Sequence, residues 1–247
     1  MAATEQRPAQ ATASDGRSRQ ETSAGGRLFW AAWAWAATLL LFVVLATLAS
    51  FYDRFPSDER IAHAIQGIDV PAFGGFVDAV NAFGVSWLYF PLVFLLIAGF
   101  VFLRAGWEAV VMLLVLVPVG LNRVVKDWVG RPRPTEDIVD VHGRSSEFSY
   151  PSGHTVATTA LFLALFFVLP AVVPWRPVRW LLQAGCVLMV AAAGPARVYV
   201  GAHWPSDALA GYLLALLCVA PVLIAYRALS RRSEPPSATY PASQPRG

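Results

Sequence analysis

Residues 155–174 read TVATTALFLALFFVLPAVVP, a run without a charged side chain that is long enough to cross a membrane as a helix. Five further apolar runs approach the roughly 20 residues that such a crossing needs. Together the six runs cover residues 28–50, 84–103, 106–125, 155–174, 178–196 and 205–226. This pattern predicts an all-α, polytopic membrane protein whose six transmembrane helices form a bundle.

The composition supports this class and argues against two others. Hydrophobic residues make up 56% of the 247 and charged residues 14%, a balance too apolar for a soluble domain of this size. The sequence pI is ≈ 9.1, yet the basic residues are spread over run ends and tails, so no nucleic-acid partner is expected. The first run follows a long polar stretch, which indicates a retained anchor helix rather than a cleaved signal peptide.

The chain divides into a membrane domain, residues 27–229, and two terminal segments, residues 1–26 and 230–247. Both segments lack the apolar content needed to fold, so we expect disordered tails there. With six crossings, both tails lie on the same side of the membrane. That side, with the turns at Arg104 and at 174–179, holds eleven of the nineteen basic residues, and the positive-inside rule makes it cytoplasmic.

Besides Arg54 and Arg60 in the first outer loop, six basic residues then fall on the outer, extracytoplasmic side, against this rule. They are Arg123, Lys126, Arg131, Arg133, Arg144 and Arg197, and Lys126 is the only lysine of the chain. Charge placed against topology in a membrane protein usually has a functional role. The alternative for Lys126 is an interfacial anchor, and for Arg123 and Arg131 a structural role and substrate contact are equally compatible with the sequence.

The outer ends of the third to sixth runs carry three polar segments, which the topology brings to one membrane surface. They read KDWVGRPRP (126–134), YPSGHT (150–155) and ARVYVGAHWPSDALAG (196–211). In the second segment, Ser152 is a suitable N-cap and Gly153 permits close approach to the backbone. The free amides of such a helix start bind anions, and we expect His154, in the first turn, to face the anion.

In the third segment, Asp207 lies four residues after His203. At this spacing the carboxylate can accept a hydrogen bond from one imidazole nitrogen, which leaves a lone pair on the other. That arrangement is typical of an oriented nucleophile. Lys126, Arg133 and Arg197 add cations suited to a tetrahedral dianion. The outer face therefore predicts phosphoryl transfer through a histidine.

These residues resemble the signature of a known family, the type 2 phosphatidic acid phosphatase superfamily of membrane lipid phosphatases. The signature is a lysine, six residues and Arg-Pro; then Pro-Ser-Gly-His; then Ser-Arg, five residues, a histidine, three residues and an aspartate. This sequence matches it at Lys126 with Arg133-Pro134, at Pro151-Ser152-Gly153-His154, and at Arg197 with His203 and Asp207. The one departure is Ala196, where the family usually has serine.

The resemblance implies a metal-independent phosphatase that uses no cofactor. His203 would attack phosphorus in line and form a phosphohistidine, with Asp207 orienting it. His154 would protonate the leaving oxygen and then activate water. The groups that would hold the phosphoryl oxygens are Lys126, Arg133, Ser152, Gly153 and Arg197. Ala196 would remove one hydroxyl near the phosphate pocket, with an expected effect on turnover or substrate choice.

Four other functions use similar residues. Two histidines and a carboxylate can form a metal site, but Lys126, Arg133 and Arg197 would repel a divalent ion. A transporter or lipid-phosphate binder would place its charges near the bilayer midplane rather than at the outer edge. A haloperoxidase would need a vanadate cofactor in the same pocket. The family's haloperoxidases are soluble, so the six predicted membrane helices argue against this function. A phosphotransferase, which passes the phosphoryl group to an alcohol, stays open.

The expected substrate is a membrane amphiphile, because the site lies at the membrane surface among apolar helices. An extracytoplasmic site in this family favours an isoprenoid diphosphate such as undecaprenyl diphosphate, with phosphatidate and phosphatidylglycerol phosphate as alternatives. The outer segment 57–84 begins with a plausible amphipathic helix at Ser57. It either borders a lipid entrance at the membrane surface or merely connects two helices. These patterns indicate no oligomeric state.

Overall fold

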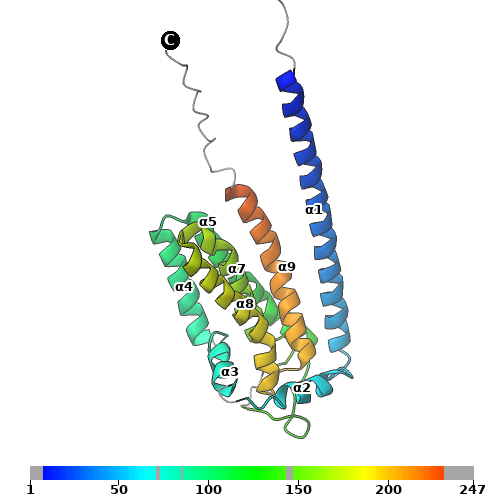
Figure 1. Ribbon diagram of the computed structural model, residues 1–247. Helices are drawn as coiled ribbons and strands as arrows, with labels where there is room; N and C mark the ends of the chain where they lie inside the picture. Colours follow the sequence, from blue (N-terminus) through cyan, green and yellow to red (C-terminus); the bar gives the residue numbers. More distant parts are fainter. Residues whose placement is uncertain (1–7, 71–72, 85, 143–146, 231–247) are drawn as a thin grey trace, which may run out of the picture. The chain divides into compact units, whose positions relative to one another are not determined.

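The computed structural model describes residues 8–70, 73–84, 86–142 and 147–230, and all regular secondary structure within them is α-helical (Figure 1). Residues Met1–Val44 form one compact unit and Leu45–Gly247 a second. The helices are α1 (Pro8–Ala49), α2 (Asp58–Gln66), α3 (Phe73–Ala82), α4 (Ser86–Phe102), α5 (Gly106–Leu114), α6 (Leu116–Val129), α7 (Gly153–Val172), α8 (Arg176–Tyr199) and α9 (Pro205–Ser230). The predicted all-α class is confirmed.

Helix α1 begins inside the segment predicted to be a disordered tail. It runs from Pro8 to Ala49, and its apolar part, Leu28–Ala49, is long enough to cross a membrane. The prediction of disorder over residues 1–26 therefore differs from the structure from Pro8 onward. No second proline follows before the span, and alanine, glutamine and arginine are good helix formers, so the span can extend toward the N-terminus. Residues 1–7 and 231–247 lie outside the described residues.

Five helical segments in the described part of the chain have the length and hydropathy expected of a membrane crossing. They are Leu28–Ala49, Gly106–Val129, Gly153–Val172, Arg176–Tyr199 and Pro205–Ser230. The second predicted run, 84–103, corresponds to α4, whose 17 residues make a helix about 25 Å long. Helix α4 is bent by 61° relative to α3. The predicted six crossings are reached only if α3 and α4 together form one broken span.

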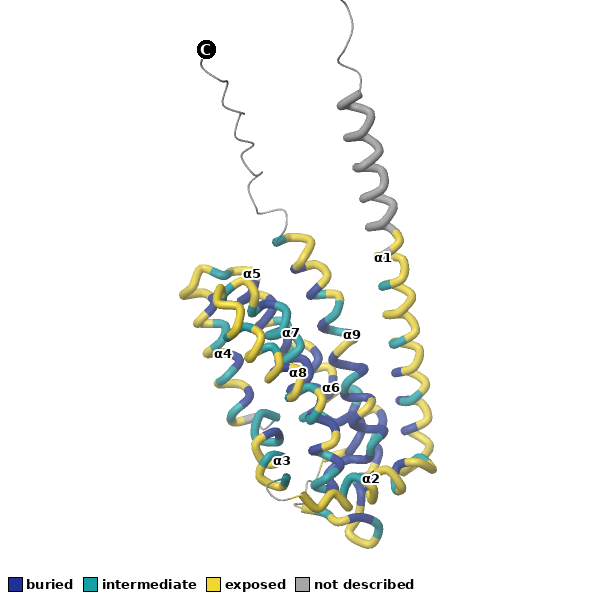
Figure 2. The backbone as a smooth tube through the Cα atoms, in the orientation of Figure 1, coloured by how far each residue is buried: buried dark blue, intermediate teal, exposed yellow. Residues whose placement is uncertain are grey.

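The largest apolar core lies where α7 and α9 pack against α4 and α5. Ala157, Ala160 and Ala164 of α7 are buried in it, and such small side chains let neighbouring helices approach closely. Buried residues follow α7 and α9 along much of their length (Figure 2). Because both helices begin at predicted site motifs, this core fixes the position of those motifs.

A proline in α8 is accommodated by a tyrosine from α9. Pro195 has no amide hydrogen, so the carbonyl of Ala191 lacks its usual helical partner. The hydroxyl of Tyr212 accepts from the amide of Gly194 at 2.7 Å and lies within donating distance of two α8 carbonyls, that of Val190 at 2.8 Å and that of Ala191 at 3.2 Å. A Cβ at residue 194 would lie 2.7 Å from the Tyr212 ring, so glycine is needed there. The tyrosine thus anchors α8 just before Arg197.

The outer helices α2 and α3 lie at the end of the second unit where α9 begins (Figure 1). Helix α2 starts after Ser57, as predicted. Its Ala62 is buried against Trp204, and the side-chain amide of Gln66 donates to the carbonyl of Tyr199 at 3.1 Å. Helix α2 is therefore packed onto the turn between α8 and α9, which is more than the connecting role left open by the sequence.

Candidate active site

The three predicted segments converge on one cavity with a volume of ≈ 670 Å³. Six of the eight predicted site residues line this cavity: Lys126, Arg133, Gly153, His154, Arg197 and His203. The other two, Ser152 and Asp207, are fully buried next to them. The structure therefore brings the three motif segments together, as the predicted topology requires.

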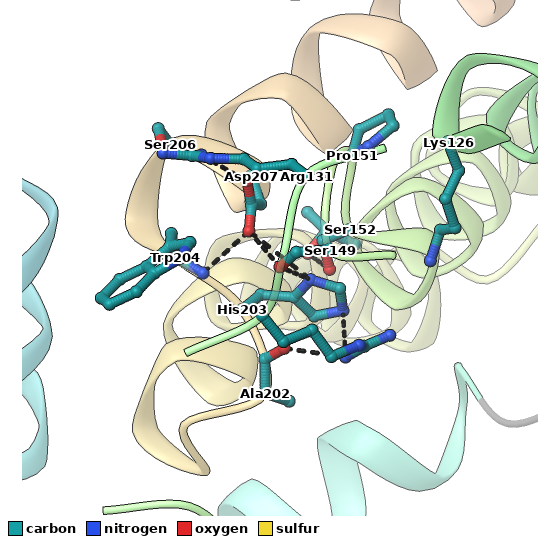
Figure 3. Close-up of polar contacts among 12 residues, drawn as sticks. Lys126, Arg131, Ser149, Pro151, Ser152, Ala202, His203, Trp204, Ser206 and Asp207 are labelled. Atoms are coloured by element: carbon teal, nitrogen blue, oxygen red, sulfur yellow. Dashed lines mark hydrogen bonds and ion pairs between the residues drawn. The ribbon is translucent and has the colours of Figure 1, made fainter. Parts of the chain in front are cut away.

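His203 is held by a serine that the motifs do not include. The hydroxyl of Ser149 donates to Oδ2 of Asp207 at 2.5 Å and lies 3.3 Å from Nδ1 of His203 (Figure 3). The distance from Nδ1 of His203 to Oδ2 of Asp207 is 3.8 Å, too long for a hydrogen bond. In place of the predicted direct hydrogen bond, Ser149 connects the two residues. The reason is that Oδ2 already accepts from Ser149 and from the amide of Trp204, at 2.9 Å.

This arrangement sets the protonation of His203. Because the Ser149 hydroxyl gives its proton to Asp207, its oxygen accepts from Nδ1–H, and Nε2 keeps a lone pair. Nε2 lies 3.3 Å from Nη1 of Arg133. Burial, and then the guanidinium groups of Arg133 and Arg197, lower the pKa of His203 well below its usual value. The imidazole is therefore neutral at pH 7 and available as a nucleophile.

Lys126 and Arg133 reach the cavity from the two ends of a tight turn. Gly130 ends α6 with φ 67°, a left-handed conformation that favours glycine, and its amide donates to the carbonyl of Lys126 at 3.0 Å. Beyond the turn, Arg133 donates through Nε to the Glu147 carbonyl at 2.8 Å and through Nη1 to the Ala202 carbonyl at 2.7 Å. These carbonyls fix the guanidinium group and leave further N–H donors for an anion.

Arg197, in the last turn of α8, has a donor without a partner among the described residues. Its Nη1 donates to Oδ1 of Asn81 in α3 at 3.0 Å, whereas its buried Nε has no hydrogen-bond partner there. Leaving such a group unpaired costs about 1–3 kcal/mol or more. Since Arg197 lines the cavity, this unpaired donor is suited to an anionic ligand.

The start of α7 supplies fewer free amides than predicted. Ser152 has the extended backbone of an N-cap, but its side chain makes no capping bond and its amide donates to the carbonyl of Asp207 at 3.0 Å. The Ser152 amide is thus occupied, whereas the amides of Gly153 and His154 have no acceptor within the helix. Gly153 is also required for packing, because a Cβ there would lie 3.1 Å from Oδ1 of Asn122.

His154 packs against a glycine from the outer segment. A Cβ at residue 84 would lie 2.4 Å from Cδ2 of His154, so the ring has room only because residue 84 is glycine. Gly84 and His154 both line the cavity that His203 borders. The cavity therefore contains a second imidazole, as predicted, in addition to the oriented one.

The role of Arg131, which the sequence left open, is decided by its burial. Arg131 is 1% exposed and donates through Nη1 to Oδ1 of Asp207 at 2.6 Å. It is therefore a structural partner of the carboxylate and is absent from the cavity lining. Glu147, which the motifs omit, lines the cavity, with Oε2 at 3.4 Å from Nζ of Lys126 and Oε1 at 2.9 Å from Nη1 of Arg123.

Ala196 does not line the cavity, although its neighbour Arg197 does. It is 2% exposed and packs in an apolar cluster with Val77 and Val80 of α3. The expected effect of losing the family's serine hydroxyl on turnover or substrate choice stays a prediction. What alanine provides at this position is an apolar contact between α8 and α3.

The cavity has the charge expected of an anion site. Four cations line it, Arg123, Lys126, Arg133 and Arg197, together with the single carboxylate of Glu147. No three His, Cys, Asp or Glu side chains come together as a metal site anywhere in the described part of the chain. Electrostatics thus favours a phosphate-like ligand over a divalent cation.

Comparison with known proteins agrees with this geometry. The sequence profile of the PAP2 superfamily matches residues 105–231, just over half of the chain. The chain belongs to the PAP2 superfamily. Phosphatidylglycerophosphatase B of Bacillus subtilis (strain 168) is 32% identical to this PAP2 protein over 183 residues, which are 72% of this chain and 87% of that protein. The undecaprenyl-diphosphatase of Sulfolobus acidocaldarius is 24% identical over 187 residues, 71% of this chain and 83% of that protein.

A solved structure shares the fold of this PAP2 protein. It is the crystal structure of the first transmembrane PAP2 type phosphatidylglycerolphosphate phosphatase from Bacillus subtilis. It covers 81% of this chain and 97% of its own, with a TM-score of 0.65 and 23% sequence identity. The family predicted from three motifs, and the helical membrane fold that it implies, are therefore confirmed.

The first prediction concerns Glu147, whose carboxylate contacts Lys126 where the phosphate is expected. Replacing it with glutamine should strengthen binding of inorganic phosphate by about two- to fivefold, because an ion pair with one exposed partner is worth about 1 kcal/mol or less. Isothermal titration of wild type and Glu147→Gln measures the effect. Glu59→Gln, at an exposed acid of α2 that contacts Arg54, is the control and should not change binding. Weaker binding in Glu147→Gln would show that the carboxylate helps to build the site.

Proposed function

We propose that this PAP2 protein hydrolyses the phosphate or diphosphate head group of a membrane lipid through a phosphohistidine on His203, without a metal ion. The observation that carries the proposal is the placement of the His203 imidazole. Its Nε2 lies 3.3 Å from Nη1 of Arg133, and its Nδ1 lies 3.3 Å from the Ser149 hydroxyl that donates to Asp207. The relatives are named phosphatidylglycerophosphatase and undecaprenyl-diphosphatase, so the enzyme class is lipid phosphate hydrolase.

In the first step Nε2 of His203 attacks phosphorus, and the bond from phosphorus to the leaving oxygen breaks. His154 donates a proton to that oxygen. Lys126, Arg133 and Arg197 stabilise the charge that spreads over the equatorial oxygens. The positive charge that develops on the imidazole is compensated by Asp207 through Ser149.

In the second step a water molecule attacks the phosphohistidine. His154, now neutral, takes a proton from the water, and the bond between phosphorus and Nε2 breaks. Inorganic phosphate leaves and His203 regains its lone pair. The same two imidazoles therefore serve both half-reactions, and no further co-reactant is needed.

The apolar part of the cavity supports a lipid as the substrate. Phe90 of α4, Leu116 and Val119 of α6, and Ala157 of α7 line it beside the charged groups. These side chains belong to the helices that traverse the bilayer, so a phosphate head bound by the cations would have its hydrocarbon chain among them. A soluble phosphate ester would leave this surface uncovered.

Two lipid classes are proposed as substrates. The first is an isoprenoid diphosphate, which suits an active site on the extracytoplasmic side of the membrane. That location follows if both chain termini lie in the cytoplasm, and the distribution of basic residues supports this orientation. Phosphatidylglycerol phosphate is the second, and the 32% identity to a phosphatidylglycerophosphatase favours it. Both carry a terminal phosphate on a polar head group that is attached to apolar chains.

The test measures phosphate release by the purified protein in detergent with EDTA present, from undecaprenyl diphosphate, phosphatidylglycerol phosphate and phosphatidate in parallel. Release that survives EDTA from at least one lipid is expected, and the preferred lipid identifies the substrate class. Formation of a phosphorylated alcohol, with loss of the lipid phosphate only when an alcohol is added, would instead indicate a phosphotransferase. Binding of the lipids without release under either condition would indicate a transporter or binding protein.

A further inference from the structure

We infer that the outer segment of residues 53–84 belongs to the active-site framework of this protein, and that Asp58 is a positioning residue for Asp207. This segment precedes residues 105–231, which the PAP2 profile matches, so the family signature assigns it no part in the reaction. The inference rests on the proposed function, because Asp207 acts through Ser149 on His203.

Arg131 connects the two carboxylates. Its Nη1 donates to Oδ1 of Asp207 at 2.6 Å and its Nη2 to Oδ2 of Asp58 at 2.9 Å. Ser206 adds a second connection, because its amide donates to Oδ1 of Asp58 at 3.0 Å and its hydroxyl to Oδ2 of Asp58 at 2.7 Å. Arg131 and Asp58 are each 1% exposed and Asp207 is fully buried. Asp58 thus holds Arg131, the cation that contacts Asp207, and also Ser206, the residue directly before Asp207 in the chain.

The charges of this cluster suit a nucleophile that becomes positive. One guanidinium cation between two buried carboxylates leaves one negative charge in excess. If Arg131 had only Asp207 as a partner, the pair would be neutral and the carboxylate would compensate the developing imidazolium of His203 less well. A buried cation shared between two carboxylates therefore keeps Asp207 effective as an acceptor. Asp58 supplies the second of those carboxylates from α2.

Asp58 is itself held firmly in place. The amide of Phe55 donates to its Oδ2 at 2.9 Å, and the Phe55 ring lies 4.7 Å from the guanidinium carbon of Arg131. At the other end of α2, Gln66 donates to the carbonyl of Asp140 at 2.6 Å and accepts from the Asp140 amide at 3.2 Å. Both ends of the helix are thus fixed to the protein, so the position of Asp58 is determined before substrate binds.

A second contact from the same segment reaches the phosphate-binding side of the cavity. Asn81 of α3 accepts from Nη1 of Arg197 at 3.0 Å, and Gly84 provides the space for the ring of His154. The segment therefore contacts the groups proposed to orient the nucleophile, to hold the phosphate and to transfer protons. A passive connector between membrane helices would not require all of these contacts.

The test replaces Asp58 with asparagine, which removes the negative charge and one of the two acceptor oxygens. Either the Ser206 amide or the group of donors to Oδ2, from Phe55, Arg131 and Ser206, then faces an NH2 group. We expect kcat for lipid phosphate hydrolysis to fall by roughly 10- to 100-fold, the loss typical of a group that supports a reacting residue from behind. KM and the dissociation constant for inorganic phosphate should stay nearly unchanged, because no phosphate ligand is altered. Ser206→Ala, a milder change in the same cluster, should lower kcat less and also leave KM unchanged.

Glu59→Gln is the matched control, because it removes the exposed carboxylate next to Asp58 in α2, which contacts Arg54 and His63 rather than Arg131 or Ser206. It should keep a kcat close to that of wild type. Equal loss of kcat in Asp58→Asn and Glu59→Gln, or a Ser206→Ala variant that turns over like wild type while Asp58→Asn fails to fold, would overturn the inference. An Asp58→Asn variant as active as wild type would overturn the inference alone, whereas an inactive wild-type protein would overturn the proposed function and the inference with it.

Discussion

Replacing His203 with alanine should reduce lipid phosphate hydrolysis by roughly 10⁴-fold or more, because it removes the atom that we propose attacks phosphorus. Binding of inorganic phosphate should largely survive, since Lys126, Arg133 and Arg197 hold an anion independently of the imidazole. The measurements are kcat with the preferred lipid and the dissociation constant for inorganic phosphate, each compared with wild type. A loss confined to kcat would distinguish a nucleophile from a phosphate ligand.

His142→Ala is the matched control for this prediction. His142 is an exposed histidine after α6, and its backbone amide donates to the carbonyl of Val200 at 2.9 Å. Its replacement should leave kcat unchanged. If His203→Ala kept more than a few per cent of wild-type activity, His203 would not be the nucleophile.

Replacing His154 with alanine should affect two lipids unequally. Loss of a general acid costs about 10²- to 10⁴-fold. Phosphatidate must expel an alkoxide, which needs a proton in the transition state, so its hydrolysis should fall near the upper end of this range. A diphosphate expels a phosphate monoester, a better leaving group, so its first step should fall less. The measurement is the kcat ratio of wild type to variant for each lipid.

Because His154 also activates water in the second step, the two steps must be separated. With the diphosphate, the His154→Ala variant should show a burst of monophosphate lipid followed by slow release of inorganic phosphate. Pre-steady-state sampling of both products measures this directly. Equal losses for phosphatidate and diphosphate in the burst phase itself would contradict the assignment of His154 as general acid.

Local patterns in the sequence were sufficient to place the lining of the site. Hydropathy located the helices, and the polar motifs at their outer ends identified six residues that line the cavity. This succeeds because α7 and α9 begin within their motifs, so that sequence position determines which end of the membrane a residue occupies. A single topology of membrane helices then accounted both for the fold and for the three motifs lying at the same membrane surface.

The groups behind the lining could not be predicted in the same way. Ser149 connects His203 to Asp207, but its only signal in the sequence is that it precedes the YPSGH motif. The contact between Asp58 and Arg131 joins residues 73 positions apart, and no periodicity encodes such a pair. Ala196 shows the same limitation, since only packing against α3 reveals which way its side chain points.

The predicted helix boundaries were wrong where amino-acid composition alone does not determine where a helix begins. The first helix extends back to Pro8 through a polar stretch, because good helix formers can prolong a helix that the membrane span already stabilises. The second predicted crossing, residues 84–103, corresponds to α4, and α3 precedes it at an angle of 61°. Hydropathy averages over a window, so it does not register a bend between two short helices.

The most direct test of the phosphohistidine mechanism is to trap the phosphorylated protein. The His154→Ala variant, mixed with a diphosphate lipid carrying a radiolabelled terminal phosphate and quenched in alkali, should retain the label on protein. The phosphohistidine mechanism predicts an acid-labile, alkali-stable phosphoryl group that fragment mass spectrometry assigns to His203. It also predicts that no label is retained when His203 is replaced as well. Label on a different residue, or turnover of the lipid by the wild type with no labelled protein at any quench time, would contradict the phosphohistidine mechanism.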